Sequence, residues 1–273
     1  MAKTILITGA SRGFGKLWAK AFLERGDKVA ATARKLADLD DLVNEFGENI
    51  TPIQLDVNDR TAVFEAVNYA NEQLGSIDVL INNAGFGLFG TIEETSEAEA
   101  RQQIETNVFG LLWVTQAILP IMRNQRHGHI IQLSSALGLT AIPTLGIYSA
   151  SKFAVEGLSE TLAAEVAGFG IKVTLLEPNG FETDWAGASA VQSKPMQEYA
   201  AIREAFQNSA KPGDYGNPAA TPAAVLKLVD SENPPLRLFL GKVAYPWIQH
   251  VYAQKLATWE EWKEVSSAAH GAE

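Results

Sequence analysis

The sequence predicts a doubly wound α/β domain, in which a parallel sheet of about seven strands carries helices on both faces. Short runs rich in Val, Ile and Leu alternate along the chain with longer segments of helical spacing. Several of the short runs are apolar at consecutive positions, which is typical of strands that are covered on both faces. Repeated alternation of strand and helix indicates a parallel sheet with helical crossovers.

The individual elements follow in chain order. The expected strands lie at residues 4–9, 28–33, 50–57, 78–85, 129–135, 172–178 and 237–241. Helices are expected at residues 15–26, 60–75, 97–124, 147–167 and 247–265. The most apolar long stretch, 108–122, contains Gln116 and Pro120 and is short for a membrane span, so we expect a buried helix there.

The alternation breaks down from about residue 183, but no interdomain linker is visible. We therefore expect a single domain over residues 1–273. Within it, the loop-rich segment 184–215 is expected to be a substrate lid, and 242–273 a C-terminal helical extension.

Composition limits the classes of function. The 273 residues carry a net charge of −10 without a basic run, which argues against nucleic acid as a partner. There is no cysteine, which excludes disulfides and thiolate metal sites, and the four histidines show no metal-ligand spacing with carboxylates, so no metal is assigned. The N-terminus lacks the features of a secretory signal. We expect a cytoplasmic protein that does not bind a membrane.

A glycine turn follows the first expected strand. TGASRGFG (8–15) places Gly9, Gly13 and Gly15 immediately before a helix. Glycine permits positive φ angles and close backbone approach, and the helix N-terminus offers unpaired N–H groups to a pyrophosphate. The alternative is a tight strand-to-helix turn that binds no ligand, because short glycine motifs also occur without one.

The end of the second strand indicates which nicotinamide cofactor is used. An acidic residue about 20 residues after the glycine turn binds the ribose of NAD, whereas an arginine accommodates the 2′-phosphate of NADP. Here the strand ends in Arg34, and Arg12 adds a second positive charge. This favours NADP(H). The alternative is that Arg34 is a solvated surface residue, which could pair with Asp38.

Tyr148 is followed four positions later by Lys152, so both would share one face of the helix expected at 147–167. A phenol titrates near pH ~10, and a nearby ammonium group would lower that pKa. Alone, the pair could be a surface helix contact. However, Ser134 and Ser135 end a strand thirteen or fourteen residues earlier, and Asn107 interrupts an apolar helical segment. Asn107 could equally form a hydrogen bond within its helix.

These motifs together, TGASRGFG, LDV, NNAG, TNVFG, SS and YSASK in order over residues 4–185, resemble the short, single-domain branch of the short-chain dehydrogenase/reductase family. The chain looks closest to its carbonyl reductases and 17β-hydroxysteroid dehydrogenase-like members. The resemblance implies a Rossmann fold and a catalytic tetrad of Asn107, Ser135, Tyr148 and Lys152. The full set expected at the cofactor is Gly9, Ser11, Arg12, Gly13, Phe14, Gly15, Arg34, Asp56, Val57, Asn83, Ala84, Gly85, Tyr148, Lys152, Pro178, Phe181 and Thr183.

The resemblance implies that NADPH delivers hydride to a carbonyl carbon while Tyr148 donates a proton and Ser135 a hydrogen bond. Lys152 would hold the nicotinamide ribose, and Asn107 a water. One departure is Asn179, where the family usually has glycine; Asn tolerates left-handed backbone, and Gly180 could take part of the strain. Competing hypotheses are an NADP(H) sensor without turnover, which would be expected to lose part of the tetrad, and an epimerase of the extended branch, which usually carries GxxGxxG.

The substrate is expected to be a small hydrophobic ketone, aldehyde or secondary alcohol. Ser135 and Tyr148 would contact it, and the apolar residues expected beside them are Phe86, Leu137, Leu145, Phe181 and Trp185. These residues could instead belong to the core. The family often forms dimers or tetramers, so a homodimer or homotetramer is expected, with helices 97–124 and 147–167 as candidate interfaces.

Overall fold

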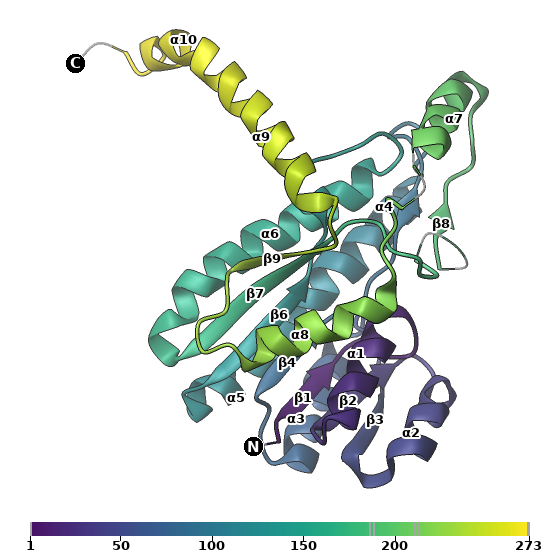
Figure 1. Cartoon of the computed structure of the whole chain (residues 1–273), viewed down its shortest axis with the longest axis vertical. Coiled ribbons are helices and arrows are strands. Elements are labelled where there is room, and N and C mark those ends of the chain that lie inside the picture. The colour runs from purple at the N-terminus through teal and green to yellow at the C-terminus, as the bar shows by residue number, and fades with distance from the viewer. Residues whose placement is uncertain (1, 186, 188, 210, 212, 272–273) are drawn as a thin grey trace.

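A single seven-stranded parallel sheet forms the centre of the protein, and its strand order is β3-β2-β1-β4-β6-β7-β9 (Figure 1). The computed structural model describes residues 2–185, 187, 189–209, 211 and 213–271. The strands are β1 (Thr4–Ile7), β2 (Lys28–Ala33), β3 (Ile50–Gln54), β4 (Val79–Asn82), β6 (Gly128–Leu133), β7 (Ile171–Pro178) and β9 (Arg237–Leu240). The predicted doubly wound sheet is confirmed.

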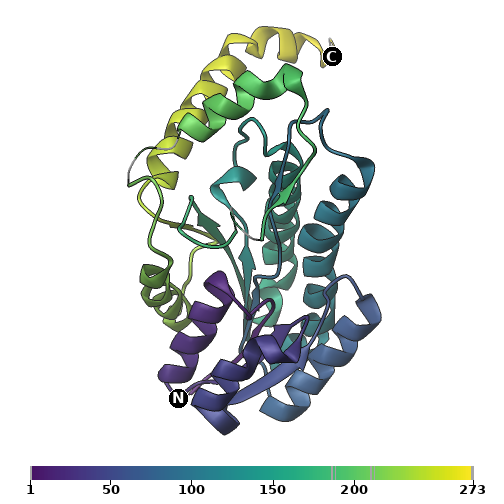
Figure 2. The ribbon, with the colours of Figure 1, turned by 90° about the vertical axis from the view of Figure 1, so that its right-hand side faces the viewer.

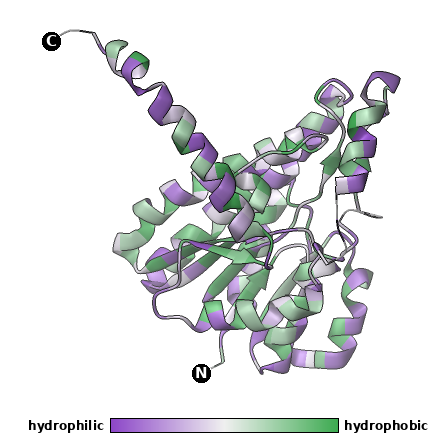
Figure 3. Ribbon diagram, turned by 45° about the horizontal axis from the view of Figure 1, so that its top comes forward, coloured by the Kyte–Doolittle hydropathy of each residue, from purple (hydrophilic) through white to green (hydrophobic). Residues whose placement is uncertain are grey.

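Helices cover both faces of this sheet, as Figure 2 shows. One apolar core lies beneath α1 (Gly13–Glu24), α2 (Asp40–Phe46) and α8 (Thr221–Asp230). The other lies beneath α3 (Arg60–Leu74), α5 (Leu111–Gln125) and α6 (Gly146–Val166). The central strands are predominantly hydrophobic in Figure 3, whereas the helices carry both colours, as expected for strands buried on both faces.

The strand order reverses between β1 and β4, because the chain builds β2 and β3 on one side of β1 before it returns to the other side. Ligands of open α/β sheets bind outside the carboxyl ends of strands at such a reversal. The ends of β1 and β4 are tied together there. The Thr8 hydroxyl accepts hydrogen bonds of 3.1 Å from the backbone N–H groups of both Asn83 and Ala84.

The segment 184–215 is more regular than its composition predicted. It contributes β8 (Val191–Gln192), which pairs with β5 (Leu88–Phe89), and α7 (Ala200–Ser209). Positions 186, 188, 210 and 212 of this expected lid lie outside the described residues, as do 1, 272 and 273 at the chain ends. The C-terminal extension forms α9 (Ala244–Glu261) and α10 (Lys263–Ala268), and α9 leads away from the sheet in Figures 1 and 3.

The helical stretch Glu97–Gln125 comprises α4 (Glu97–Ile104), a π-helical segment (Glu105–Gly110) and α5. It is, within the described part of the chain, the one stretch that is long and apolar enough to cross a membrane by length and composition alone. Core helices meet the same criterion. Val114 and Ile118 of α5 are buried in the second core.

Candidate active site

The glycine turn after β1 is closely packed on one side and open on the other. Gly9 and Gly13 have φ angles of +69° and +56°, which side chains rarely adopt. A Cβ atom at Gly9 would lie 2.9 Å from the Cα of Ala84, and one at Gly15 would overlap the Gly9 carbonyl oxygen. A Cβ at Gly13, by contrast, would meet no atom within 4 Å. The turn therefore presents open backbone at Gly13.

The first turn of α1 is suited to an anion. Its N-cap residue, Arg12, has extended backbone and its side chain makes no capping hydrogen bond, and no acidic residue lies in that turn. The backbone N–H groups at a helix start lack partners within the helix and attract negative charge. The backbone therefore fits the pyrophosphate of a dinucleotide.

A cavity of about 270 Å³ lies beside this turn and is lined by Ser11, Arg12, Arg34 and Asp38. The two guanidinium groups are those that the sequence assigned to the 2′-phosphate of NADP. Arg34 and Asp38 are both exposed, as the alternative of a solvated Arg34 requires, but these two described residues form no ion pair within 4.0 Å. Sequence reasoning had not placed the Asp38 carboxylate in a cofactor cavity.

Other residues expected at the cofactor surround this edge of the sheet. Asn83 supports the turn, since its Nδ2 donates hydrogen bonds of 2.9 Å to the carbonyl oxygens of both Thr8 and Gly9. Its side chain is thus used within the protein, although the family resemblance places it along the ribose. Asp56 is exposed after β3, whereas Val57 is buried and packs against Gly110.

Phe14 connects the turn to the loop after β7. Its ring stacks on Trp18, with centroids 5.1 Å apart, and meets the edge of Phe181 at the same distance. Thr183 lies in that loop, and its backbone N–H donates to the Phe181 carbonyl at 2.8 Å. Pro178 ends β7 immediately before the loop.

The expectation that Asn179 or Gly180 takes left-handed backbone is wrong. Neither has a positive φ angle; among the described residues other than glycine, Arg126 and Thr144 do. The Asn179 side chain instead fastens the loop, donating from Nδ2 to the carbonyl oxygen of Gly180 at 2.7 Å. It also fills the space that Gly241 leaves by lacking a side chain.

Tyr148 and Lys152 are both buried on α6, one helical turn apart. Burial raises the pKa of Tyr148 above its ordinary value of 10, while the neighbouring Ser135 side chain lowers it. Burial lowers the pKa of Lys152 to about 8, partly offset by the charge of Glu156. Lys152 Nζ lies 5.7 Å from the Tyr148 ring centroid and donates to the Leu133 carbonyl oxygen at 2.7 Å.

The net effect on Tyr148 is opposite to the sequence expectation. Lys152 was expected to lower the phenol's pKa, but burial dominates and the Lys152 ammonium is directed to a backbone carbonyl. Tyr148 is therefore protonated at neutral pH, the state in which a general acid begins.

The structure gives the two serines after β6 different environments. Ser134 Oγ donates a 2.5 Å hydrogen bond to Glu156 Oε1, so its side chain points toward α6. Ser135 caps the short 3₁₀ helix Ala136–Gly138, accepting from Leu137 N at 3.1 Å, and lies beside Tyr148. Ser135, rather than Ser134, is thus the serine next to the Tyr148 phenol.

Asn107 lies in the π-helical segment and joins three parts of the site. Its Oδ1 accepts from the backbone N–H of Phe86, and its Nδ2 donates to the Phe86 carbonyl, both at 3.1 Å. Nδ2 also donates to Ser151 Oγ at 3.2 Å. Its bonds therefore run between elements rather than within its own helix. Such π-helical segments often occur at functional sites.

Apolar side chains close over Tyr148. Leu137 and Leu145 pack with it in one buried cluster, and the ring of Trp185 meets the Tyr148 ring with centroids 4.8 Å apart. Phe86, also expected at the substrate, is not part of this cluster. The structure adds members that the sequence did not identify: Phe89, Ile142, Phe206 and Trp247. Phe206 and Trp247 come from remote segments, so only the fold could reveal them.

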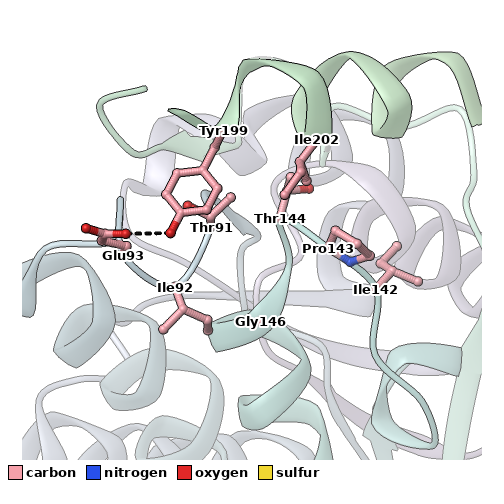
Figure 4. A pocket seen from close by; sticks show the side chains of 9 residues that line it. All are labelled: Thr91, Ile92, Glu93, Ile142, Pro143, Thr144, Gly146, Tyr199 and Ile202. Carbon is pink, nitrogen blue, oxygen red and sulfur yellow. Dashed lines mark hydrogen bonds between the residues drawn. The ribbon is translucent and has the colours of Figure 1, made fainter. Parts of the chain in front are cut away.

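A second cavity, of about 410 Å³, opens next to this cluster (Figure 4). Ile92, Ile142, Pro143 and Ile202 provide apolar walls, and Tyr199 Oη donates to Glu93 Oε2 at 2.5 Å along one side. Thr91, Thr144 and Gly146 complete the lining. No residue predicted from the sequence to contact substrate lines this cavity.

No group of three or more His, Cys, Asp or Glu side chains that could hold a metal ion occurs in the part of the chain that the structure describes.

Known proteins resemble this chain over most of its length. The family model described as "short chain dehydrogenase" matches residues 3–194. The chain is 42% identical to Oxidoreductase BOA17 of Botryotinia fuckeliana, over 98% of this chain and 100% of the relative. It is 40% identical to the 3-ketodihydrosphingosine reductase of Bacteroides thetaiotaomicron, over 92% and 90% of the two chains.

Solved structures extend the comparison to fold and cofactor. A short-chain dehydrogenase from Streptomyces avermitilis superposes with a TM-score of 0.91 at 39% identity, covering 98% of both chains. A short chain dehydrogenase from Burkholderia cenocepacia, in complex with NADP, has a TM-score of 0.77 at 27% identity over 95% and 97%. One from Burkholderia phymatum, in complex with NAD, has a TM-score of 0.78 at 26% identity over 97% and 95%.

These neighbours support a nicotinamide cofactor without choosing between NAD and NADP. The family match covers more than half of the chain and includes Asn107, Ser135, Tyr148 and Lys152. The chain is a member of the short-chain dehydrogenase/reductase family of oxidoreductases.

Proposed function

We propose that this oxidoreductase is an NADP(H)-dependent reductase of hydrophobic ketones or aldehydes, which also oxidises the corresponding secondary alcohols. The observation that carries the proposal is that Tyr148 lies beside both Ser135 and Lys152 at the carboxyl end of β6. An acid, a hydrogen-bond donor and a cation there match the reduction of a carbonyl group.

When bound, the reduced nicotinamide supplies the hydride. Tyr148, which burial keeps protonated, donates its proton to the oxygen of the carbonyl group as negative charge develops there. Ser135 donates a hydrogen bond to the same oxygen, where it has most effect in the transition state. Lys152 then stabilises the phenolate. In the oxidative direction Tyr148 must first lose its proton, which its burial opposes.

The choice of NADP(H) is supported by Arg12 and Arg34. Both line the cavity at the start of α1, and a planar guanidinium group matches the geometry of a phosphate. Asp38 shares the cavity, but two positive charges outnumber one negative charge. We expect Arg34→Ala to weaken NADPH binding by roughly tenfold, about 1.4 kcal/mol, and to leave NADH binding unchanged.

A hydrophobic substrate is supported by the side chains around Tyr148. Leu137, Leu145 and Trp185 surround the phenol, and the larger apolar cavity begins at Gly146, two residues before it. A relative is named for the reduction of a keto compound. We further propose that the protein acts in the cytoplasm on small molecules, without nucleic acid or membrane partners, as a homodimer or homotetramer.

The test follows NADPH and NADH absorbance at 340 nm with a panel of hydrophobic ketones, aldehydes and diketones. We expect faster consumption of NADPH, abolished by Tyr148→Phe. Tyr69→Phe, which alters an exposed tyrosine on α3, is the matched control and should retain activity. Cofactor binding without turnover on any carbonyl compound would contradict the reductase proposal and favour a sensor.

A further inference from the structure

The end of β6 meets α6 at three successive residues. The Leu133 carbonyl accepts from Lys152 Nζ, Ser134 Oγ donates to Glu156 Oε1, and Ser135 lies beside Tyr148. The α6 residues in these contacts are 148, 152 and 156, each one helical turn from the next. Each of the outer two contacts includes members of the expected tetrad, namely Lys152 in the first and Ser135 with Tyr148 in the third. It gives no role to the middle one, between Ser134 and Glu156.

We propose that Ser134 and Glu156 are positioning residues, whose hydrogen bond fixes the strand end and thereby holds Ser135 against Tyr148. This inference rests on the proposed function, because the positioned groups are those assigned to proton transfer. Neither residue touches the reacting atoms. They act through the backbone that joins Ser134 to Ser135.

The Glu156 carboxylate is held from both sides, so it can serve as a fixed point. Its Oε1 accepts from Ser134, and its Oε2 accepts from Arg237 Nε at 3.0 Å. Arg237, on β9, also donates to Glu160 Oε2 at 2.6 Å, one turn further along α6. With both oxygens bonded, rotation of the carboxylate would break a charge-assisted hydrogen bond.

The packing over this contact leaves little room for adjustment. A Cβ atom at Gly138 would lie 2.7 Å from Ser134 Oγ and 2.9 Å from Glu156 Cγ. The 3₁₀ helix that follows Ser135 is therefore pressed directly onto the hydrogen bond. A shift of Ser134 would move Ser135 with it.

A second buried carboxyl group, Glu177 on β7, completes the surroundings. Its side chain is fully buried, and its Oε1 lies 3.4 Å from Arg237 Nε. Burial and then the charge of Glu156 raise the pKa of Glu177 well above its usual range, which favours its protonated form. The charged groups near Glu156 are then Lys152 and Glu160 on its own helix and Arg237 from β9. Arg237 remains the counter-charge of Glu156.

Burying a carboxylate costs free energy, and an apolar contact would join a helix to a sheet without that cost. A directional hydrogen bond, however, fixes the position of the serine backbone, which an apolar contact would not. This is the physical reason to assign the pair to geometry rather than to stability.

The test compares Ser134→Ala, Glu156→Leu and their combination. Each single variant should lower kcat by roughly tenfold, equivalent to about 1.4 kcal/mol, while KM for NADPH changes by less than about twofold. The double variant should be no slower than either single variant, because both remove the same contact. Glu156→Gln keeps an oxygen that can accept from Ser134, so it should retain most of the activity.

Ser159→Ala is the matched control. Ser159 is a buried serine on the same helix, and its Oγ has no hydrogen-bond partner among the described residues. We expect it to keep kcat unchanged. A similar loss in this control, or additive losses in the double variant, would overturn the positioning role.

Crystal structures of the wild type and Ser134→Ala provide a readout that does not depend on turnover. We expect the variant to show Ser135 Oγ displaced from the Tyr148 hydroxyl. An unchanged Ser135–Tyr148 geometry would overturn the inference even if activity falls. Absence of turnover in the wild type would count against the proposed function alone, and the displacement would still decide the positioning role.

Discussion

Raising the pH above 8 is expected to reduce catalytic efficiency through Lys152. Burial lowers the pKa of this ammonium group from 10.5 to about 8, a difference that corresponds to about 3 kcal/mol against the charged form. Lys152 is thus charged below pH 8 in the free enzyme, and its charged fraction falls about tenfold per pH unit above that. Tyr148 adds no loss in this range, because burial raises its pKa.

The assay is the pH dependence of NADPH-linked carbonyl reduction between pH 6 and pH 9.5. We expect kcat/KM to be level up to about pH 8 and then to fall. The fall in kcat should lie at higher pH, because kcat reports the complex, in which a hydrogen bond from Lys152 to the nicotinamide ribose favours the charged form of the lysine. Lys152→Arg remains charged throughout, so its profile should lack the fall whatever its absolute rate.

The matched control is Glu177→Gln, because the raised pKa of Glu177 brings a second group into the same pH range. If Lys152 is responsible, the fall in kcat/KM persists in Glu177→Gln. A wild-type profile that stays level to pH 9.5, or a fall that disappears in Glu177→Gln, would refute the reasoning.

Further predictions concern the cofactor turn, stability and substrate access. Gly15→Ala should weaken NADPH binding at least roughly tenfold in a fluorescence titration, because the new Cβ would overlap the Gly9 carbonyl oxygen; unchanged affinity would show that the turn can open. Because the pKa of Glu177 is raised in the folded protein, its contribution to the free energy of unfolding depends on pH. That contribution is fully present below the ordinary pKa of 4.5 and is lost as the pH rises through the folded-state pKa. In urea unfolding, the free energy of unfolding of Glu177→Gln should lack this loss, which is at most about 1.4 kcal/mol per pH unit in the wild type. The same pH dependence of the free energy of unfolding in both proteins would contradict this. Trp185→Ala should raise kcat/KM for bulky ketones relative to small ones, since Trp185 covers Tyr148, and an unaltered ratio would argue that the ring does not limit access.

The fold was largely predictable from the sequence because local pattern and tertiary burial agree. The second strand was expected at 28–33 and occupies Lys28–Ala33. The third was expected to reach residue 57 but ends at Gln54, since Leu55 and Val57 remain buried after the chain has left the sheet. An apolar pattern predicts which residues are buried, and here residues remain buried beyond Gln54, the last residue of the strand.

The candidate site was predictable only where one motif contains the chemistry. Tyr148 and Lys152 share a helix, so their spacing alone places them on one face. The contact of Glu156 with Arg237 spans 81 positions and exists because β9 pairs with β7. The hydrogen bonds of Asn107 to Phe86 likewise depend on how two segments meet, which no local pattern records.

The exposure of the C-terminal helices divides the six tryptophans of this chain into optically distinct groups. Trp18 is fully buried, whereas Trp259 and Trp262 are 61% and 60% exposed. The exposed pair should emit at longer wavelength and be quenched by iodide, while Trp18 should be protected. Whatever comes to cover α9, the quenchable fraction of the emission would fall. The molecule thus carries its own fluorescent reporter of events at its C-terminal end.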